Sequence, residues 1–115
     1  MKLDALDSFF AFSPALKKCN KKMNTNLAEV HINILTFLLI CSSENGYTSF
    51  NEILENLNDA AHPITKETLR KKLECLVSNG YIKYSNQTYS LSPIGSKYMN
   101  ELENDMEEII KTINE

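Results

Sequence analysis

The stretch TLRKKLECLVSNGYIKYSNQTYSLSPIGSKYM, residues 68–99, changes its hydrophobic period repeatedly. Its first part places apolar residues at helical spacing and ends at Asn79-Gly80, a pair that favours a left-handed helix cap. Residues 81–84 and 88–91 then alternate as β-strands do, around a short polar turn. Ser92-Pro93 restarts a helix, because proline is well accepted at the first helical position. The stretch therefore predicts a helix, a small hairpin and another helix in direct succession.

The part of the chain before residue 50 is predicted to be helical. Residues 2–23 form either one kinked helix or two short ones, with the break at Ser13-Pro14. Asn26, with Glu29 three residues later, is predicted to cap the next helix. That helix is apolar nearly all round, which is typical of a central core helix.

Two further helices are marked by their caps. Ser49 and Glu52 have the spacing of a capping box for a helix over 50–59. Thr65 is predicted to cap a helix over 65–79. The complete order is helix, helix, helix, helix, hairpin, helix, which is a mainly α fold with a small β-hairpin.

Composition narrows the class of function. The chain has 115 residues, 43% of them hydrophobic and 23% charged, as expected of one ordinary globular domain. The net charge is −3, so a nucleic-acid binder needs a local basic face, and the positive charge is indeed gathered in residues 1–23 and 61–84. The chain contains three glycines and none of the common catalytic motifs, so we do not expect an enzyme.

The spacing of the cysteines and the length of the apolar runs indicate in which cellular compartment the protein works. Cys19, Cys41 and Cys75 form no CxxC pair, which is typical of a reducing compartment and predicts neither a metal site nor a cofactor. Cys75 is either a helix residue without a functional role or a redox-responsive thiol. The start MKLDALDSFF has no signal-peptide pattern, and the apolar run at 34–41 is too short to span a bilayer. We expect a cytoplasmic protein without a membrane partner.

A helix pair followed at once by a two-stranded hairpin is the arrangement of a winged helix-turn-helix. The helices over 50–59 and 65–79 would form the pair, with the second helix in the DNA major groove. The chain also resembles the MarR-like winged-helix regulators, with the PadR group close behind. The residues that carry the resemblance are TKETLRKKLECLVSNGYI, the short wing, YSLSPIGSKYM with Gly95, and the long helices at both ends.

The resemblance implies a single winged-helix domain over 1–115, with an N-terminal arm (1–25), a core (26–92) and a C-terminal dimerisation helix (93–115). It also implies a set of positions that face DNA. On the recognition helix and the wing these are Thr65, Lys66, Glu67, Thr68, Arg70, Lys71, Lys83, Asn86 and Gln87. The sequence departs from the family in its uncharged wing tip and in its long link over 58–64.

The last helix carries apolar residues at spacings of 3, 4, 3 and 4, the pattern of a narrow heptad seam. These residues are Met99, Leu102, Met106, Ile109 and Ile113. The seam predicts a homodimer; its alternative is a helix that covers the core of its own chain. His31 is interpreted either as a structural histidine or as part of a small-molecule effector pocket at the dimer interface.

Two functions follow from these observations. The first is a homodimeric DNA-binding repressor on a pseudo-palindromic operator in double-stranded DNA, with half-sites about 10 base pairs apart. The second is a winged-helix protein–protein interaction module without sequence-specific DNA binding. The basic residues of helix 65–79 are then only a solvated face, as charge runs usually are. Four lysines of the N-terminal helix either approach phosphates or form a plain exposed face: Lys17, Lys18, Lys21 and Lys22.

Overall fold

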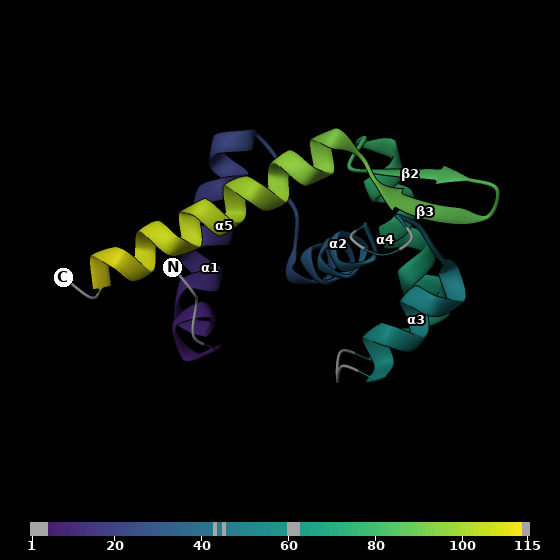
Figure 1. The fold of residues 1–115 in the computed structure, drawn as a ribbon, viewed down its shortest axis with the longest axis horizontal. Helices are drawn as coiled ribbons and strands as arrows, with labels where there is room; N and C mark the ends of the chain where they lie inside the picture. The colour runs from purple at the N-terminus through teal and green to yellow at the C-terminus, as the bar shows by residue number, and fades with distance from the viewer. Residues whose placement is uncertain (1–4, 43, 45, 60–62, 114–115) are drawn as a thin grey trace. The chain divides into compact units, whose positions relative to one another are not determined.

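The computed structural model describes residues 5–42, 44, 46–59 and 63–113, with the side chains of 5–9, 42 and 113 left aside. Over these residues the protein is mainly helical with a small antiparallel sheet (Figure 1). The chain divides into two compact units, residues 28–96 and residues 1–27 with 97–115. The elements are α1 (Ala5–Met23), α2 (Glu29–Ser42), β1 (Thr48–Ser49), α3 (Phe50–Asp59), α4 (Lys66–Ser78), β2 (Ile82–Ser85), β3 (Thr88–Leu91) and α5 (Pro93–Ile113).

The core of the unit 28–96 is built around α2, as its apolar circumference predicted. Three of its side chains are buried almost completely, and α3 and α4 each add an apolar stripe at helical spacing. These residues are Ile34, Leu35, Leu38, Ile53, Leu57, Leu69, Leu73 and Leu76. The stripe of α4 fixes which of its faces is turned away from the core.

The predicted helix caps of α3 and α4 are confirmed. Ser49 N donates to Glu52 Oε1 and Glu52 N donates to Ser49 Oγ, both at 3.3 Å, which is the reciprocal pattern of a capping box. Thr65 Oγ1 accepts from Thr68 N at 3.1 Å at the start of α4. At the other end Gly80 takes the left-handed conformation with φ of +81°, as the Asn79-Gly80 pair predicted.

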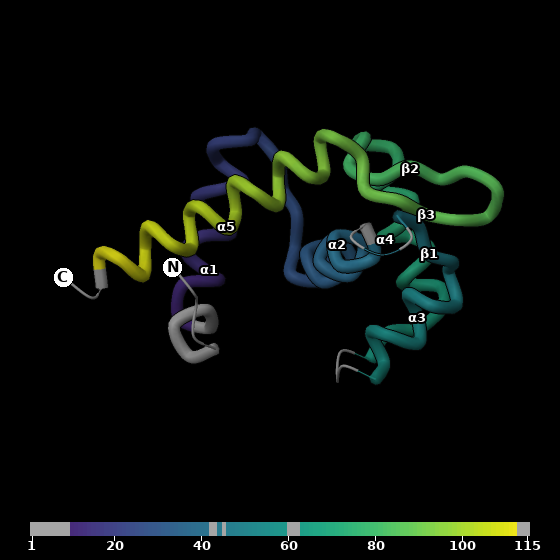
Figure 2. Tube along the Cα trace, viewed as in Figure 1, coloured from purple at the N-terminus to yellow at the C-terminus, as the bar shows by residue number. Residues whose placement is uncertain are grey.

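The hairpin is confirmed, and a third strand joins it. Tyr84 pairs with Tyr89 across β2 and β3, and the turn residues Asn86 and Gln87 both have positive φ, as a two-residue type I′ hairpin requires. The strand order is β1-β3-β2, with β1 running along β3 (Figure 2). β1 was not predicted, because a two-residue strand directly before a helix has no hydrophobic period of its own.

The sequence left the continuity of α1 open and predicted where α2 starts. A single helix α1 runs through Pro14, so the two-helix alternative does not hold. The predicted cap at Asn26 is wrong, because α2 begins at Glu29 and the amide of Ala28 donates to His31 Nδ1 at 2.9 Å. A histidine inside the helix therefore takes over the capping that a side chain before the helix was expected to perform.

In the other unit α1 packs against the C-terminal part of α5. The buried residues of α1 are small and four apart, Ala11, Ala15 and Cys19, which lets the two helices approach closely. Cys19 Sγ lies 3.8 Å from the carbonyl oxygen of Tyr98, and the Tyr98 hydroxyl donates to Asn20 Oδ1 at 2.6 Å. None of the helices that the structure describes is long and apolar enough to cross a membrane.

Candidate nucleic-acid interface

The outward face of α4 carries charged side chains of both signs. Successive helical residues are about 100° apart, so residues 67, 71 and 74 lie opposite the buried leucines and residue 70 lies on the flank of that side. All four are exposed, and Lys66 at the helix start is exposed as well. We call Lys66, Glu67, Arg70, Lys71 and Glu74 the outward face of α4. Its three cations exceed its two carboxylates, so the face is mildly positive in a chain that is acidic overall.

Arg70 is the cation of this face that tertiary contacts position. Its guanidinium carbon lies 5.7 Å from the ring centroid of Phe50, the first residue of α3, within the range of a cation–π contact. The pKa of Tyr89 on β3 is raised by burial and by Tyr84, whereas the positive charge of Arg70 opposes that rise. Arg70 therefore acts electrostatically on the hairpin while it stacks on α3.

Lys71 is held only weakly. Its Nζ lies 3.7 Å from Glu67 Oε1 one turn earlier, and both side chains are largely exposed. Ion pairs of this kind contribute about 0.3–0.5 kcal/mol and are screened by salt. Lys71 can therefore exchange Glu67 for a phosphate at little cost, and Lys66 makes no ion pair with any described residue.

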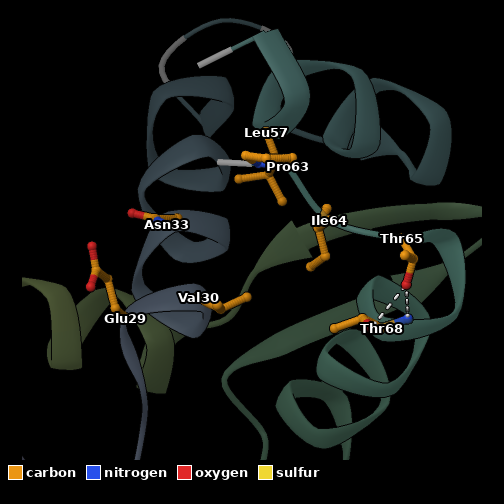
Figure 3. Close-up of a pocket in the computed structure, with 8 residues that line it drawn as sticks. All are labelled: Glu29, Val30, Asn33, Leu57, Pro63, Ile64, Thr65 and Thr68. Carbon is orange, nitrogen blue, oxygen red and sulfur yellow. Dashed lines mark hydrogen bonds between the residues drawn. The ribbon is translucent and has the colours of Figure 1, made fainter. Parts of the chain in front are cut away.

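Thr65 and Thr68, which the resemblance placed among the DNA-facing positions, are exposed at the start of α4. Their hydroxyls bond to each other at 2.9 Å, and the Thr65 hydroxyl also caps the helix. Both residues line a pocket of about 540 Å³ between α2, α3 and the start of α4 (Figure 3). The sequence carries no local signal for this pocket, because the residues that line it come from separate segments.

The hairpin presents polar and aromatic side chains. Lys83, Asn86 and Gln87 are exposed, as a wing that touches DNA would require, and the turn carries no charge. The rings of Tyr84 and Tyr89 meet across the strands in a tilted arrangement with centroids 4.8 Å apart, and Tyr84 remains 54% exposed. This pair was not among the predicted site residues. The period-two pattern could have revealed it, since residues opposite in a hairpin share one face.

His31, Cys19 and Cys75 are not grouped into a catalytic or metal-binding site. His31 is buried, and burial first, then Lys72, lowers its pKa, which favours the neutral imidazole whose Nδ1 accepts the amide of Ala28. Cys19 is fully buried, and burial is the largest cause of its raised pKa. Cys75 is half-buried and accepts a long bond from Asn79 Nδ2. Across the part of the chain that the structure describes, no cluster of His, Cys, Asp or Glu could hold a metal ion.

The heptad seam of α5 is divided between two environments. Met99 and Leu102 are buried within the single chain, so for them the alternative of covering the chain's own core applies. Met106 and Ile109 are half-buried, and the side chain of Ile113 lies outside the described residues. Ile110, which the seam did not include, is buried as well.

Two of the four α1 lysines are engaged by acids of α5. Lys22 Nζ lies 2.8 Å from Asp105 Oδ1 and 3.1 Å from Glu101 Oε2, and both bonds raise its pKa. Lys18 Nζ lies 3.0 Å from Glu108 Oε2 and lowers the pKa of that carboxyl. The charge of these two lysines is thus balanced inside the chain, which favours the plain-face interpretation over a phosphate contact.

Comparison of the chain with protein families, with curated protein sequences and with solved structures gave no match.

Proposed function

We propose that the protein is a DNA-binding transcriptional regulator whose unit 28–96 is a winged helix-turn-helix. In this proposal α3 and α4 are the helix pair, α4 is the recognition helix and the β2–β3 hairpin is the wing. The observation that carries it is the placement of Arg70, which projects from the outward face of α4 and is stacked on Phe50. A cation held by an aromatic ring loses less side-chain freedom on binding, which favours its use as a contact.

On the DNA, Lys66, Arg70 and Lys71 would neutralise phosphates or donate to guanine, whose major-groove edge offers two acceptors. Glu67 and Glu74 lie among these cations and can accept from cytosine or repel a wrongly placed phosphate. Because the carboxylates reduce the attraction to any duplex, the face is better suited to selecting a sequence than to coating DNA.

The hairpin would touch DNA through Lys83 and the turn residues Asn86 and Gln87. Because the turn is uncharged, we do not expect it to act as a basic finger in the minor groove. The exposed ring of Tyr84 offers an apolar surface to the sugar-phosphate edge instead. The wing thus contributes position more than affinity.

We further propose that the protein acts as a homodimeric repressor in the cytoplasm. The half-buried residues Met106 and Ile109 are the part of the α5 seam that a second chain would cover. Two recognition helices would then enter successive major grooves of an inverted repeat. An effector at the dimer interface belongs to the same proposal, but His31, the residue first considered for it, is a buried helix-capping group.

The test is selection of bound duplexes from a random pool at low and near-physiological salt. We expect an enriched inverted repeat with half-sites about 10 base pairs apart. A pool that stays random, with binding that disappears as salt rises, would leave only non-specific attraction and refute the proposal.

The alternative proposal is a winged-helix module that binds proteins. It is favoured by the net charge of −3 and by the exposed Tyr84 beside an uncharged turn. Aromatic residues are enriched at such interfaces, whereas net acidity opposes DNA. Salt separates the two functions, because an apolar protein interface responds little to salt and a phosphate-based one responds strongly.

A further inference from the structure

The pocket between α2, α3 and the start of α4 has a mainly apolar interior. Its volume of about 540 Å³ lies in the range of ligand pockets, about 300–1,000 Å³. Val30, Ile64 and Thr68 point toward a common space, with Leu57 and Pro63 above them (Figure 3). All of these side chains except that of Thr68 are hydrocarbon, so a molecule in the common space meets mainly apolar surface.

The charged groups at the pocket stay outside this space. Glu29 is the one charged residue among the described lining residues, and its carboxylate points away from the common space, as the amide of Asn33 does (Figure 3). Lys66 and Lys72 lie within about one helical turn of the lining threonines of α4, outside the lining itself. A charge that entered the space would lose its hydration without gaining a counter-ion. The interior therefore selects against charged ligands of either sign.

The helix N-termini beside the pocket give an anion little advantage. The first turns of α2 and α4 both contribute lining residues, and helix N-termini attract anions. However, Thr68 N donates to the Thr65 hydroxyl, and the amide of Ala28 donates to His31 Nδ1. In addition, the first turn of α2 already carries the carboxylate of Glu29. Amides that an anion would need are thus in use, and a negative charge already lies close to them.

One hydroxyl at the pocket has a proton to donate. Thr65 Oγ1 accepts from Thr68 N at 3.1 Å and donates to Thr68 Oγ1 at 2.9 Å, so it acts as acceptor and donor at once. Thr68 Oγ1 accepts that proton, and none of the described residues accepts the proton that Thr68 itself carries. An oxygen atom of a ligand in the common space can accept it. The site thus matches a ligand with an apolar body and one acceptor oxygen.

We propose that this pocket binds a small uncharged molecule, with its apolar body against Val30 and Ile64 and its oxygen accepting a hydrogen bond from the Thr68 hydroxyl. Because the amide of Ile64 donates to Asn58 Oδ1 at 3.0 Å, such a ligand also supports the link that leads into α4. A change in the placement of α4 would change the affinity for DNA. This coupling rests on the proposed function, whereas the binding site does not.

The probe is acetophenone, an uncharged aromatic ketone, added to the full-length ¹⁵N-labelled chain. Benzoate and benzylamine are charged molecules of similar size, and toluene has the ring without the oxygen. We expect acetophenone to bind with a Kd of about 1 mM and to shift the amides of Val30, Asn33, Ile64 and Thr68. Benzoate and benzylamine should each bind at least about fivefold more weakly, because their charge finds no partner in the pocket.

The hydrogen bond is tested by Thr68→Val, with Thr112→Val as its matched control. Thr112 is an exposed threonine of α5 that does not line the pocket. We expect Thr68→Val to weaken acetophenone about three- to tenfold, the effect of one hydrogen bond, and to leave the Kd of toluene unchanged. An unchanged toluene Kd also shows that the variant keeps the shape of the pocket. Thr112→Val should change neither ligand.

Three results would overturn the assignment: amide shifts that lie away from the pocket, benzoate or benzylamine binding as tightly as acetophenone, or equal effects of the two Val variants. The coupling to DNA is measured separately, by repeating a DNA titration at saturating acetophenone. Failure to bind any duplex would refute the DNA proposal while the amide shifts still decide the pocket. Amide shifts with no change in DNA affinity would refute the coupling alone.

Discussion

Replacing Gly95 with alanine is predicted to damage the junction between the hairpin and α5. A Cβ at this position would lie 2.1 Å from the carbonyl oxygen of Tyr81 and 2.9 Å from a methyl of Leu91. The Tyr81 oxygen is backbone and accepts the amide of Ser92 at 3.1 Å, so it cannot move aside alone. The first turn of α5 must shift instead, which strains the bond from Gly95 N to the capping Ser92 Oγ.

The size of the effect follows from two contributions. Overpacking of a buried site costs about 1–3 kcal/mol, and a weakened backbone hydrogen bond costs about 1 kcal/mol. We therefore expect Gly95→Ala to lower the free energy of unfolding by about 3 kcal/mol. For a chain of 115 residues this corresponds to a fall of roughly 12 °C in Tm.

Gly46→Ala is the matched control. Gly46 has a φ of +83°, so alanine there is strained, but its Cβ would meet no atom of the described residues within 4 Å. Backbone strain alone costs about 1–2 kcal/mol. Urea unfolding followed by circular dichroism would compare the two variants with the wild type. A Gly95→Ala protein as stable as Gly46→Ala, or within about 1 kcal/mol of the wild type, would refute the reasoning.

Asn20→Ala should lower the free energy of unfolding by about 3 kcal/mol, measured by urea unfolding, because the Asn20 side chain makes four hydrogen bonds near the end of α1. Tyr98→Phe removes only one of these bonds and should lower it by about 1 kcal/mol. Equal losses in the two variants would contradict this account. Stability should fall as the pH drops below about 6.5, because the lowered pKa of His31 makes the unfolded state bind more protons there. That fall should vanish in His31→Gln and persist in His62→Gln. Iodoacetamide should label Cys19 last among the three thiols, since it is fully buried and its pKa is raised; early labelling on mass spectrometry would show that α1 separates from α5 in the native state.

Local signals in the sequence predicted local structure well. The caps at Ser49 and Thr65, the end of α4 at Gly80 and the two-stranded hairpin each depend on residues within a few positions of one another. Because of Pro14, the sequence alone could not decide between one helix and two over residues 2–23, and the structure has a single helix over Ala5–Met23.

The features that matter for the site depend on contacts between distant residues. Arg70 meets Phe50 across 20 positions, and neither residue is unusual in its own segment. The division of the α5 seam depends on α1, whose Lys22 binds Asp105. A seam read from one helix cannot show which of its residues another helix of the same chain already covers.

Thr68 illustrates the same limit at the scale of one helix. By resemblance it belongs with the DNA-facing residues, and the structure shows that this exposed residue also lines the pocket with Val30. Facing directions within a helix depend on which leucines reach the core, and here Leu69, Leu73 and Leu76 set that direction.

The central claim is that α4 binds DNA through its outward face, and Arg70→Gln tests it most directly. The measurement is the affinity for the selected duplex across a series of salt concentrations, by fluorescence anisotropy, with Lys97→Gln as a control that removes the same charge from an exposed site on α5. We predict that Arg70→Gln weakens binding about tenfold and, if the contact is to phosphate, flattens the salt slope by about one unit, whereas Lys97→Gln changes little. Equal behaviour of the two variants would contradict the account.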